Sequence, residues 1–190
     1  ESACVLQSQA PVPEDRLDTV ASLLRSDKRC VILMGGTEID NQRGYLFGQI
    51  AKATGARLCS DVFPTRMARG AGTVVIDRLP YLAEAAIEYL KDTEALILIG
   101  VEAPVSFFAY PGVPSEIAPS TCHTFQLAGH NDDLDALLTN LIERLGADAV
   151  QPDTQTLDIP VLPEGALDAM SAAQALAHLL LSQTLEGWQA

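Results

Sequence analysis

A glycine-containing turn, Gly35-Gly36-Thr37, is the first place in the chain where the residues could bind a ligand. It follows a continuous apolar run and precedes a predicted helix. Glycines let the backbone approach a bound group closely, and the N–H groups that begin a helix attract phosphate. The segment reads GGTEID and lacks the G-x-G-x-x-G spacing of dinucleotide-binding loops. A tight turn that needs small residues is the simpler interpretation, and Glu38 and Asp40 would oppose a bound diphosphate.

Two arginines, Arg66 and Arg69, lie in the loop after the next predicted strand. Loops that follow parallel strands share the carboxyl edge of the sheet, where ligands bind in doubly wound folds. Two guanidinium groups there could hold an anion between them. Surface ion pairs with neighbouring carboxylates explain the same two residues equally well.

A third loop follows the apolar run ALILI and begins with Gly100, Val101 and Glu102. Because each of the three loops follows a parallel strand, we predict that they converge on one crevice that could hold a nucleotide. Glu102 adds to the negative charge near this crevice. We therefore expect the crevice to be empty or to bind nucleotides weakly, with the two arginines supplying most of the attraction for phosphate.

Aromatic side chains gather in the same third loop, at Phe107, Phe108 and Tyr110. They could cover an adenine or flavin ring. Packing against another domain is the interpretation we favour, because a cluster of exposed aromatic residues commonly marks an interface.

The remaining reactive residue types show no catalytic spacing. The histidines lie in three separate predicted elements, at His123, His130 and His178. The cysteines have no C-x-x-C spacing and mostly fall in or beside apolar runs, which is typical of small buried side chains in a reducing compartment. They are Cys4, Cys30, Cys59 and Cys122. The sequence therefore predicts no catalytic residue and no metal ligand in this chain.

Strands and helices alternate between residues 14 and 146, and this order positions the three loops. Helices are predicted over 14–26, 41–54, 80–90 and 132–145, with Pro80 in the first helical turn and Asp132 as an N-cap; strands are predicted over 30–34, 56–60, 73–76, 95–99 and 123–127. The alternation indicates an α/β, Rossmann-like doubly wound fold with a mainly parallel sheet and helices on both faces. We expect strands 30–34 and 95–99 to be adjacent at its centre, because both are apolar throughout.

The chain divides into four segments by composition. Residues 1–13 contain two prolines and are predicted to be an entering linker, and residues 14–146 form the α/β domain. Residues 147–165 are polar with further prolines, as in a linker. Residues 166–190 are predicted to begin a helix of a further, truncated domain, so the chain has the character of a fragment.

The net charge of −13 over 190 residues disfavours nucleic acids and anionic membranes as partners. No apolar run approaches the ~20 residues that a membrane-spanning helix requires. We expect a soluble, cytoplasmic protein.

Several stretches carry a resemblance to a known family. The order of VILMGG, ALILIG and the helices around them resembles the central domain of thiamine-diphosphate-dependent enzymes. The stretches VFPTRMARGAG, DRLPYLAEAA and IGVEAPVSFFAYPGVPS resemble a subgroup like the large subunit of acetolactate synthase, and the last stretch is the most specific. The resemblance covers residues 14–146, and the tail from Ala166 resembles the beginning of the following domain.

The resemblance implies a longer parent with three α/β domains that acts on 2-oxo acids as a synthase (a transferase) or a decarboxylase. The first domain would supply an activating glutamate, and the third a GDG…N motif that holds Mg²⁺ and the coenzyme diphosphate. No GDG triplet occurs in this chain. The resemblance therefore implies a non-catalytic scaffold, with the flanking domains of the same chain as its partners and a homo-oligomeric parent.

Some members of the family bind FAD in this domain. The segments that correspond to their FAD-binding loops read VEAPVSFFAYPG and FQLAGHNDD here, without the Arg-and-Asp-containing loop of those relatives. We therefore expect no tight FAD binding. A free-standing nucleotide- or flavin-binding domain of Rossmann-like fold stays open as the alternative function.

Overall fold

The computed structural model describes residues 9–36, 38–108 and 111–187. These residues form two compact units. The first comprises the described residues up to Arg69 together with 73–154, and the second comprises 70–72 together with the described residues from Gln155 onward. Within this part of the chain, no helix has both the length and the apolar character that crossing a bilayer requires.

A five-stranded parallel sheet forms the centre of the first unit, with the strand order β5-β3-β1-β6-β7. The strands are β1 (Cys30–Met34), β3 (Arg57–Ser60), β5 (Asp77–Arg78), β6 (Ala95–Ile99) and β7 (His123–Ala128). The predicted α/β class and parallel sheet are confirmed. The predicted central pair is confirmed as well, because β1 and β6 pair from Cys30 with Ala95 to Met34 with Ile99.

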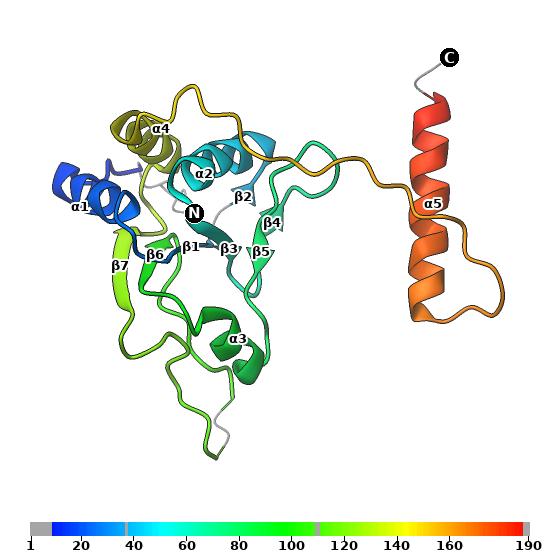
Figure 1. Cartoon of the computed structure of the whole chain (residues 1–190), viewed down its shortest axis with the longest axis horizontal. Coiled ribbons are helices and arrows are strands. Elements are labelled where there is room, and N and C mark those ends of the chain that lie inside the picture. The colour runs from blue at the N-terminus through cyan, green and yellow to red at the C-terminus, as the bar shows by residue number, and fades with distance from the viewer. Residues whose placement is uncertain (1–8, 37, 109–110, 188–190) are drawn as a thin grey trace, which may run out of the picture. The chain divides into compact units, whose positions relative to one another are not determined.

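Helices cover both faces of this sheet, as predicted (Figure 1). The helices α1 (Glu14–Leu24), α2 (Asn41–Thr54) and α4 (Leu134–Leu145) pack on one face, and α3 (Ala83–Leu90) packs on the other. Side chains alternate along β1, so that Cys30, Ile32 and Met34 join the three-helix core while Val31 and Leu33 join the core beneath α3. Burial of such an aliphatic side chain contributes about 1.5–3 kcal/mol. Two-sided burial therefore explains why this strand carries no polar residue.

A second, two-stranded parallel sheet is formed by β2 (Glu38–Ile39) and β4 (Arg66–Met67). The sequence interpretation had placed both segments in loops. Ile39 is buried in the core of the first unit, and the half-buried Met67 packs against the same core. These two apolar contacts anchor a pair that is too short to be recognised from sequence periodicity.

The ends of α2 follow directly from its sequence. The carboxylate of Asp40 accepts a hydrogen bond from the backbone N–H of Arg43 at 2.9 Å and so caps the first turn. Gly55 ends the helix in the left-handed region at φ 74°, as predicted.

Three details of the predicted elements are wrong. The cap of α4 is Asp133, which accepts from Ala136 N–H, whereas Asp132 accepts from Gly129 N–H in the preceding turn.

The strand predicted over 73–76 forms instead at Asp77–Arg78, where the backbone pairs with β3. The helix predicted from Pro80 begins at Ala83, because Leu79 is buried and donates its N–H to the carbonyl of Ser60, which keeps this segment extended.

The chain segments before α1 and after α4 also pack within the first unit. Ala10 bonds with the backbone of Asn131 and Asp133, and Val12, just before α1, is buried. Residues 147–154 lie within the predicted linker, yet Ala147 is fully buried there. The buried amide of Gln49 on α2 donates to the carbonyls of Ala147, Asp148 and Val150 at 3.1–3.3 Å, and this fixes the segment against α2.

The second unit contains the helix α5 (Ala169–Gly187), which begins three residues later than the predicted start. Asp168 stands just before the helix, and its carboxylate accepts the N–H of Ser171 at 2.7 Å. This local cap explains the later start, because it leaves residues 166–168 outside the helix.

We predict that Gln49→Leu lowers the free energy of unfolding by about 1–3 kcal/mol, because three buried or half-buried carbonyls lose their donor. Urea unfolding followed by circular dichroism measures the change. The control is Gln42→Leu, the same substitution at an exposed position of α2, which should stay within about 0.5 kcal/mol of the unsubstituted chain. Equal effects at the two positions would show that the amide contacts are not stabilising.

Candidate functional site

The loops that follow β1 and β6 meet at the carboxyl edge of the sheet. After β1, the next strand of this sheet along the chain, β3, lies on one side of β1, and the later strand β6 lies on its other side. The strand order therefore reverses between β1 and β6. Ligands of open α/β sheets bind at such a reversal. A hollow of about 370 Å³ lies here, lined by residues that include Gly36, Gly100, Val101 and Glu102. Gly35 lines a much smaller neighbouring cavity together with Gly36 and Gly100.

The two predicted arginines are not brought to these glycines. Arg66 belongs to β4, where its backbone pairs with that of Glu38, and its side chain is exposed. Arg69 is also exposed, and neither arginine lines either cavity among the described residues. Thr37, the third residue of the predicted turn, lies outside the described residues. Binding of a nucleotide at these positions stays a prediction.

The glycines at this edge are required by the close approach of the two loops. A Cβ atom built on Gly100 would lie 2.4 Å from the carbonyl oxygen of Gly35, and one built on Gly36 would lie 2.4 Å from that of Gly100 and 2.3 Å from Nδ1 of His130. Both Gly36 and Gly100 are in the left-handed region, at φ 69° and 63°. The space that a side chain would occupy therefore holds protein atoms, which supports the simpler interpretation of the turn.

Two backbone N–H groups at this edge already have partners. The N–H of Gly35 donates to the carbonyl of Ile99 at 3.0 Å, and that of Gly100 donates to the carbonyl of Ala128 at 2.8 Å. Phosphate sites beside glycine-rich turns depend on backbone N–H groups that point at the ligand. Neither of these two groups is available for that role.

Carboxylates and aromatic rings supply the chemistry of the 370 Å³ hollow. Asp61 and Glu102 line it together with Phe63 and Phe107. His130 and Thr65 add two further polar side chains, and the rest of the lining is small or apolar. Sequence reasoning identified Glu102 and the ring of Phe107 but missed Asp61 and Phe63. The signal was present, because both missed residues follow β3 and so emerge at the same edge.

Four aromatic side chains contact one another beside this hollow. Tyr81 stacks on Phe107 with ring centroids 5.4 Å apart, and Phe63 meets both rings edge-on at 5.6–5.8 Å. Phe108 meets Tyr81 edge-on at 5.8 Å. Tyr110, which the sequence placed in this cluster, lies outside the described residues. No sequence pattern indicated Tyr81, since it comes from the segment before α3.

Neither a ready-made metal cluster nor a reactive thiol is found among the described residues. Among them, no three histidine, cysteine, aspartate or glutamate side chains gather as a metal would require. The described cysteines are also poor nucleophiles. Burial raises the pKa of the Cys59 thiol to about 12 and raises those of Cys30 and Cys122, which disfavours the reactive thiolate.

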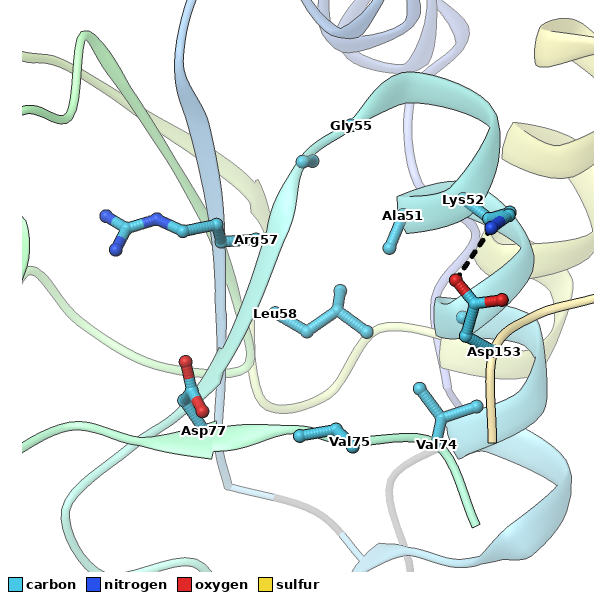
Figure 2. Close-up of a pocket in the computed structure, with 11 residues that line it drawn as sticks. Ala51, Lys52, Gly55, Arg57, Leu58, Val74, Val75, Asp77 and Asp153 are labelled. Atoms are coloured by element: carbon cyan, nitrogen blue, oxygen red, sulfur yellow. Dashed lines mark hydrogen bonds and ion pairs between the residues drawn. The ribbon is translucent and has the colours of Figure 1, made fainter. Parts of the chain in front are cut away.

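A second hollow, of about 400 Å³, lies between the end of α2 and the strands β3 and β5 (Figure 2). Apolar side chains that include Leu58, Val74 and Val75 form its walls. Its charged groups already pair with protein groups. Lys52 bonds to Asp153 at 2.7 Å, Asp77 accepts from the Tyr89 hydroxyl at 2.9 Å, and Arg57 donates to the Tyr89 carbonyl at 3.1 Å. This hollow therefore presents few polar groups to a ligand.

We predict that Gly100→Ala destabilises the fold more than Gly55→Ala. Both positions are left-handed, so alanine costs about 1–2 kcal/mol of backbone strain at each. Only at Gly100 would the new Cβ meet backbone, which should add about 1–3 kcal/mol. Urea unfolding of the two variants provides the comparison, and equal losses would contradict the packing role of Gly100.

No family model matches the chain. The chain is 36% identical over 179 residues to the Mycobacterium tuberculosis protein named "Putative acetolactate synthase large subunit IlvX". The match covers 94% of this chain and 34% of that protein, so the chain spans about a third of the length of this curated relative.

Two solved structures share the fold. One is an X-ray structure of "a putative thiamin diphosphate-dependent enzyme isolated from Mycobacterium smegmatis", with a TM-score of 0.53, 16% identity, and coverage of 83% of this chain and 33% of that one. The other is the thiamine diphosphate-dependent 4-hydroxybenzoylformate decarboxylase of Rhodococcus jostii, with a TM-score of 0.51, 15% identity, and coverage of 88% and 33%. The sequence of this chain is therefore similar to about a third of a protein named as an acetolactate synthase large subunit, and its fold is shared with about a third of two thiamine-diphosphate-dependent enzymes.

Proposed function

We propose that this chain is the central domain of an acetolactate-synthase-like enzyme that acts on 2-oxo acids, and that it serves as a scaffold without catalytic residues. The observation that carries the proposal is the extent of the match. The similarity runs through 94% of this chain but through only 34% of the relative, so about two thirds of a relative of this kind has no counterpart here.

The chemistry of the chain supports the same division of roles. Thiamine diphosphate is the group that would supply the reactive carbanion in the parent enzyme. In this proposal the coenzyme and Mg²⁺ bind to other parts of the parent chain, where the GDG motif would lie. This chain would hold its neighbouring domains in position, within a cytoplasmic homo-oligomer with transferase or decarboxylase activity. The absence of a GDG triplet from the sequence supports this assignment.

We also propose that the crevice between the β1 and β6 loops is a vestigial nucleotide site with weak affinity at most. Its topology is that of a nucleotide site, but two of its N–H groups bond within the protein. Asp61 and Glu102 line it, and they would repel a diphosphate. Any attraction for phosphate would come from Arg66 and Arg69, which are not among the residues that line the crevice.

We predict that the chain gives no saturable heat when it is titrated with thiamine diphosphate and Mg²⁺ in a calorimeter, and that it does not consume pyruvate. The reason is that the groups expected to bind the coenzyme belong to other domains. A full-length thiamine-diphosphate-dependent enzyme, titrated in the same buffer, serves as the positive control. Saturable binding in the micromolar range by this chain alone would overturn the scaffold assignment.

We predict that excess FAD leaves the melting temperature of the chain unchanged. A ligand whose free concentration is ~100 times its dissociation constant would stabilise the fold by about 2.7 kcal/mol, which is readily measured. A clear rise that is lost in Arg66→Ala, but kept in the control Arg78→Ala, would instead support a functional flavin- or nucleotide-binding domain. Arg78 is the suitable control because it is exposed on β5 and lines neither cavity of the carboxyl edge.

A further inference from the structure

The hollow at the carboxyl edge has the wrong charge for the anionic ligands that this fold commonly binds. The carboxylates of Asp61 and Glu102 line it together with the imidazole of His130, and no lysine or arginine does so among the described residues. Asp61 is half-buried and accepts the N–H of Val62 at 2.7 Å, which fixes its orientation. A partly enclosed space bordered by two carboxylates attracts cations and repels anions more strongly than open solvent does.

Two aromatic rings of the same lining remain open to solvent. Phe63 is 66% exposed and Phe107 is 48% exposed, although both border the hollow. Both rings can therefore contact a ligand in the hollow. The face of such a ring carries partial negative charge and attracts a cation placed over it.

The rings are held in place before any ligand arrives. Phe107 stacks on Tyr81 with an interplanar angle of 24°, and Phe63 meets Phe107 edge-on at 65°. Each ring is thus supported by another, so that little side-chain freedom would be lost on binding. The arrangement therefore provides a preorganised aromatic wall.

Size and wall composition narrow the class of ligand. A volume of about 370 Å³ is at the lower end of the range for small-molecule sites. The lining of the hollow also includes the apolar side chains of Val62, Val101 and Val105. A small organic cation with an apolar body matches both kinds of surface, whereas a bare metal ion would leave the rings and valines without a contact.

We propose that this hollow binds a small organic cation, an alkylammonium or arylammonium compound. The ammonium group lies over the aromatic wall of Phe63 and Phe107, and Asp61 and Glu102 balance its charge. The apolar body of the ligand contacts the valine side chains. This proposal goes beyond the scaffold function proposed above, because it concerns a bound ligand and not the neighbouring domains.

The probe for the test is benzyltrimethylammonium, compared with neutral benzyl alcohol and anionic benzoate. Chemical-shift titration of the isotope-labelled chain measures all three, with the backbone signals of Val101 and Val105 as reporters. We expect saturable shifts with the cation, about tenfold weaker binding of the alcohol, and the weakest binding of benzoate.

Two substitutions remove the two attractions separately. Phe107→Leu removes a ring but keeps an apolar side chain, and Glu102→Gln removes a charge at an exposed position. Each should weaken binding of the cation several-fold, and Glu102→Gln should leave the affinity for benzyl alcohol unchanged. The matched controls are Phe125→Leu and Glu116→Gln. Phe125 is half-buried on β7 and Glu116 is exposed, and neither lines the hollow or belongs to the four-ring cluster. Both controls should bind the cation as the unsubstituted chain does.

The result that overturns the proposal is equal or tighter binding of benzoate, or no saturable shift with the cation up to millimolar concentration. Loss of binding in the controls to the same degree as in the two site variants would also overturn it. Urea unfolding of each variant distinguishes loss of the site from loss of the fold. Glu102→Gln keeps the test decisive if Phe107→Leu does not fold, because Glu102 is exposed.

Discussion

The pairing of β1 with β6, two strands buried on both faces, is the constraint on which the rest of the first unit depends. Neither strand has a side that could face water, so helices must cover the sheet above and below. The three helices on one face and α3 on the other satisfy this requirement (Figure 1). The parallel direction of the pair then brings the ends of both strands, and the loops that follow them, to the same edge.

The same pairing explains why glycines are required at that edge. With β1 and β6 side by side, the backbone of Gly35 and that of Gly100 come so close that no Cβ fits at Gly100. Their N–H groups bond to neighbouring strand ends. The glycines allow one loop to pack closely on the other. The side chains that remain to act on a ligand are acidic and aromatic.

The fold of this chain recurs as part of longer proteins. Two solved thiamine-diphosphate-dependent enzymes contain the same fold in about a third of their length. The buried Gln49, which holds the chain after α4 against α2, shows how firmly the first unit fixes the segment that leads out of it.

The sequence by itself determined the fold class, the central strand pair and the boundaries of α2, because these depend on apolar periodicity, N-caps and glycine stops that act over a few residues. It also determined that the β1 and β6 loops share one edge. Only the tertiary structure decided that Arg66 pairs into β4 away from the glycines, that β5 begins at Asp77, and that Phe63 and Tyr81 join Phe107 in one cluster. These features depend on contacts between residues far apart in the chain, and local patterns carry no information about such contacts.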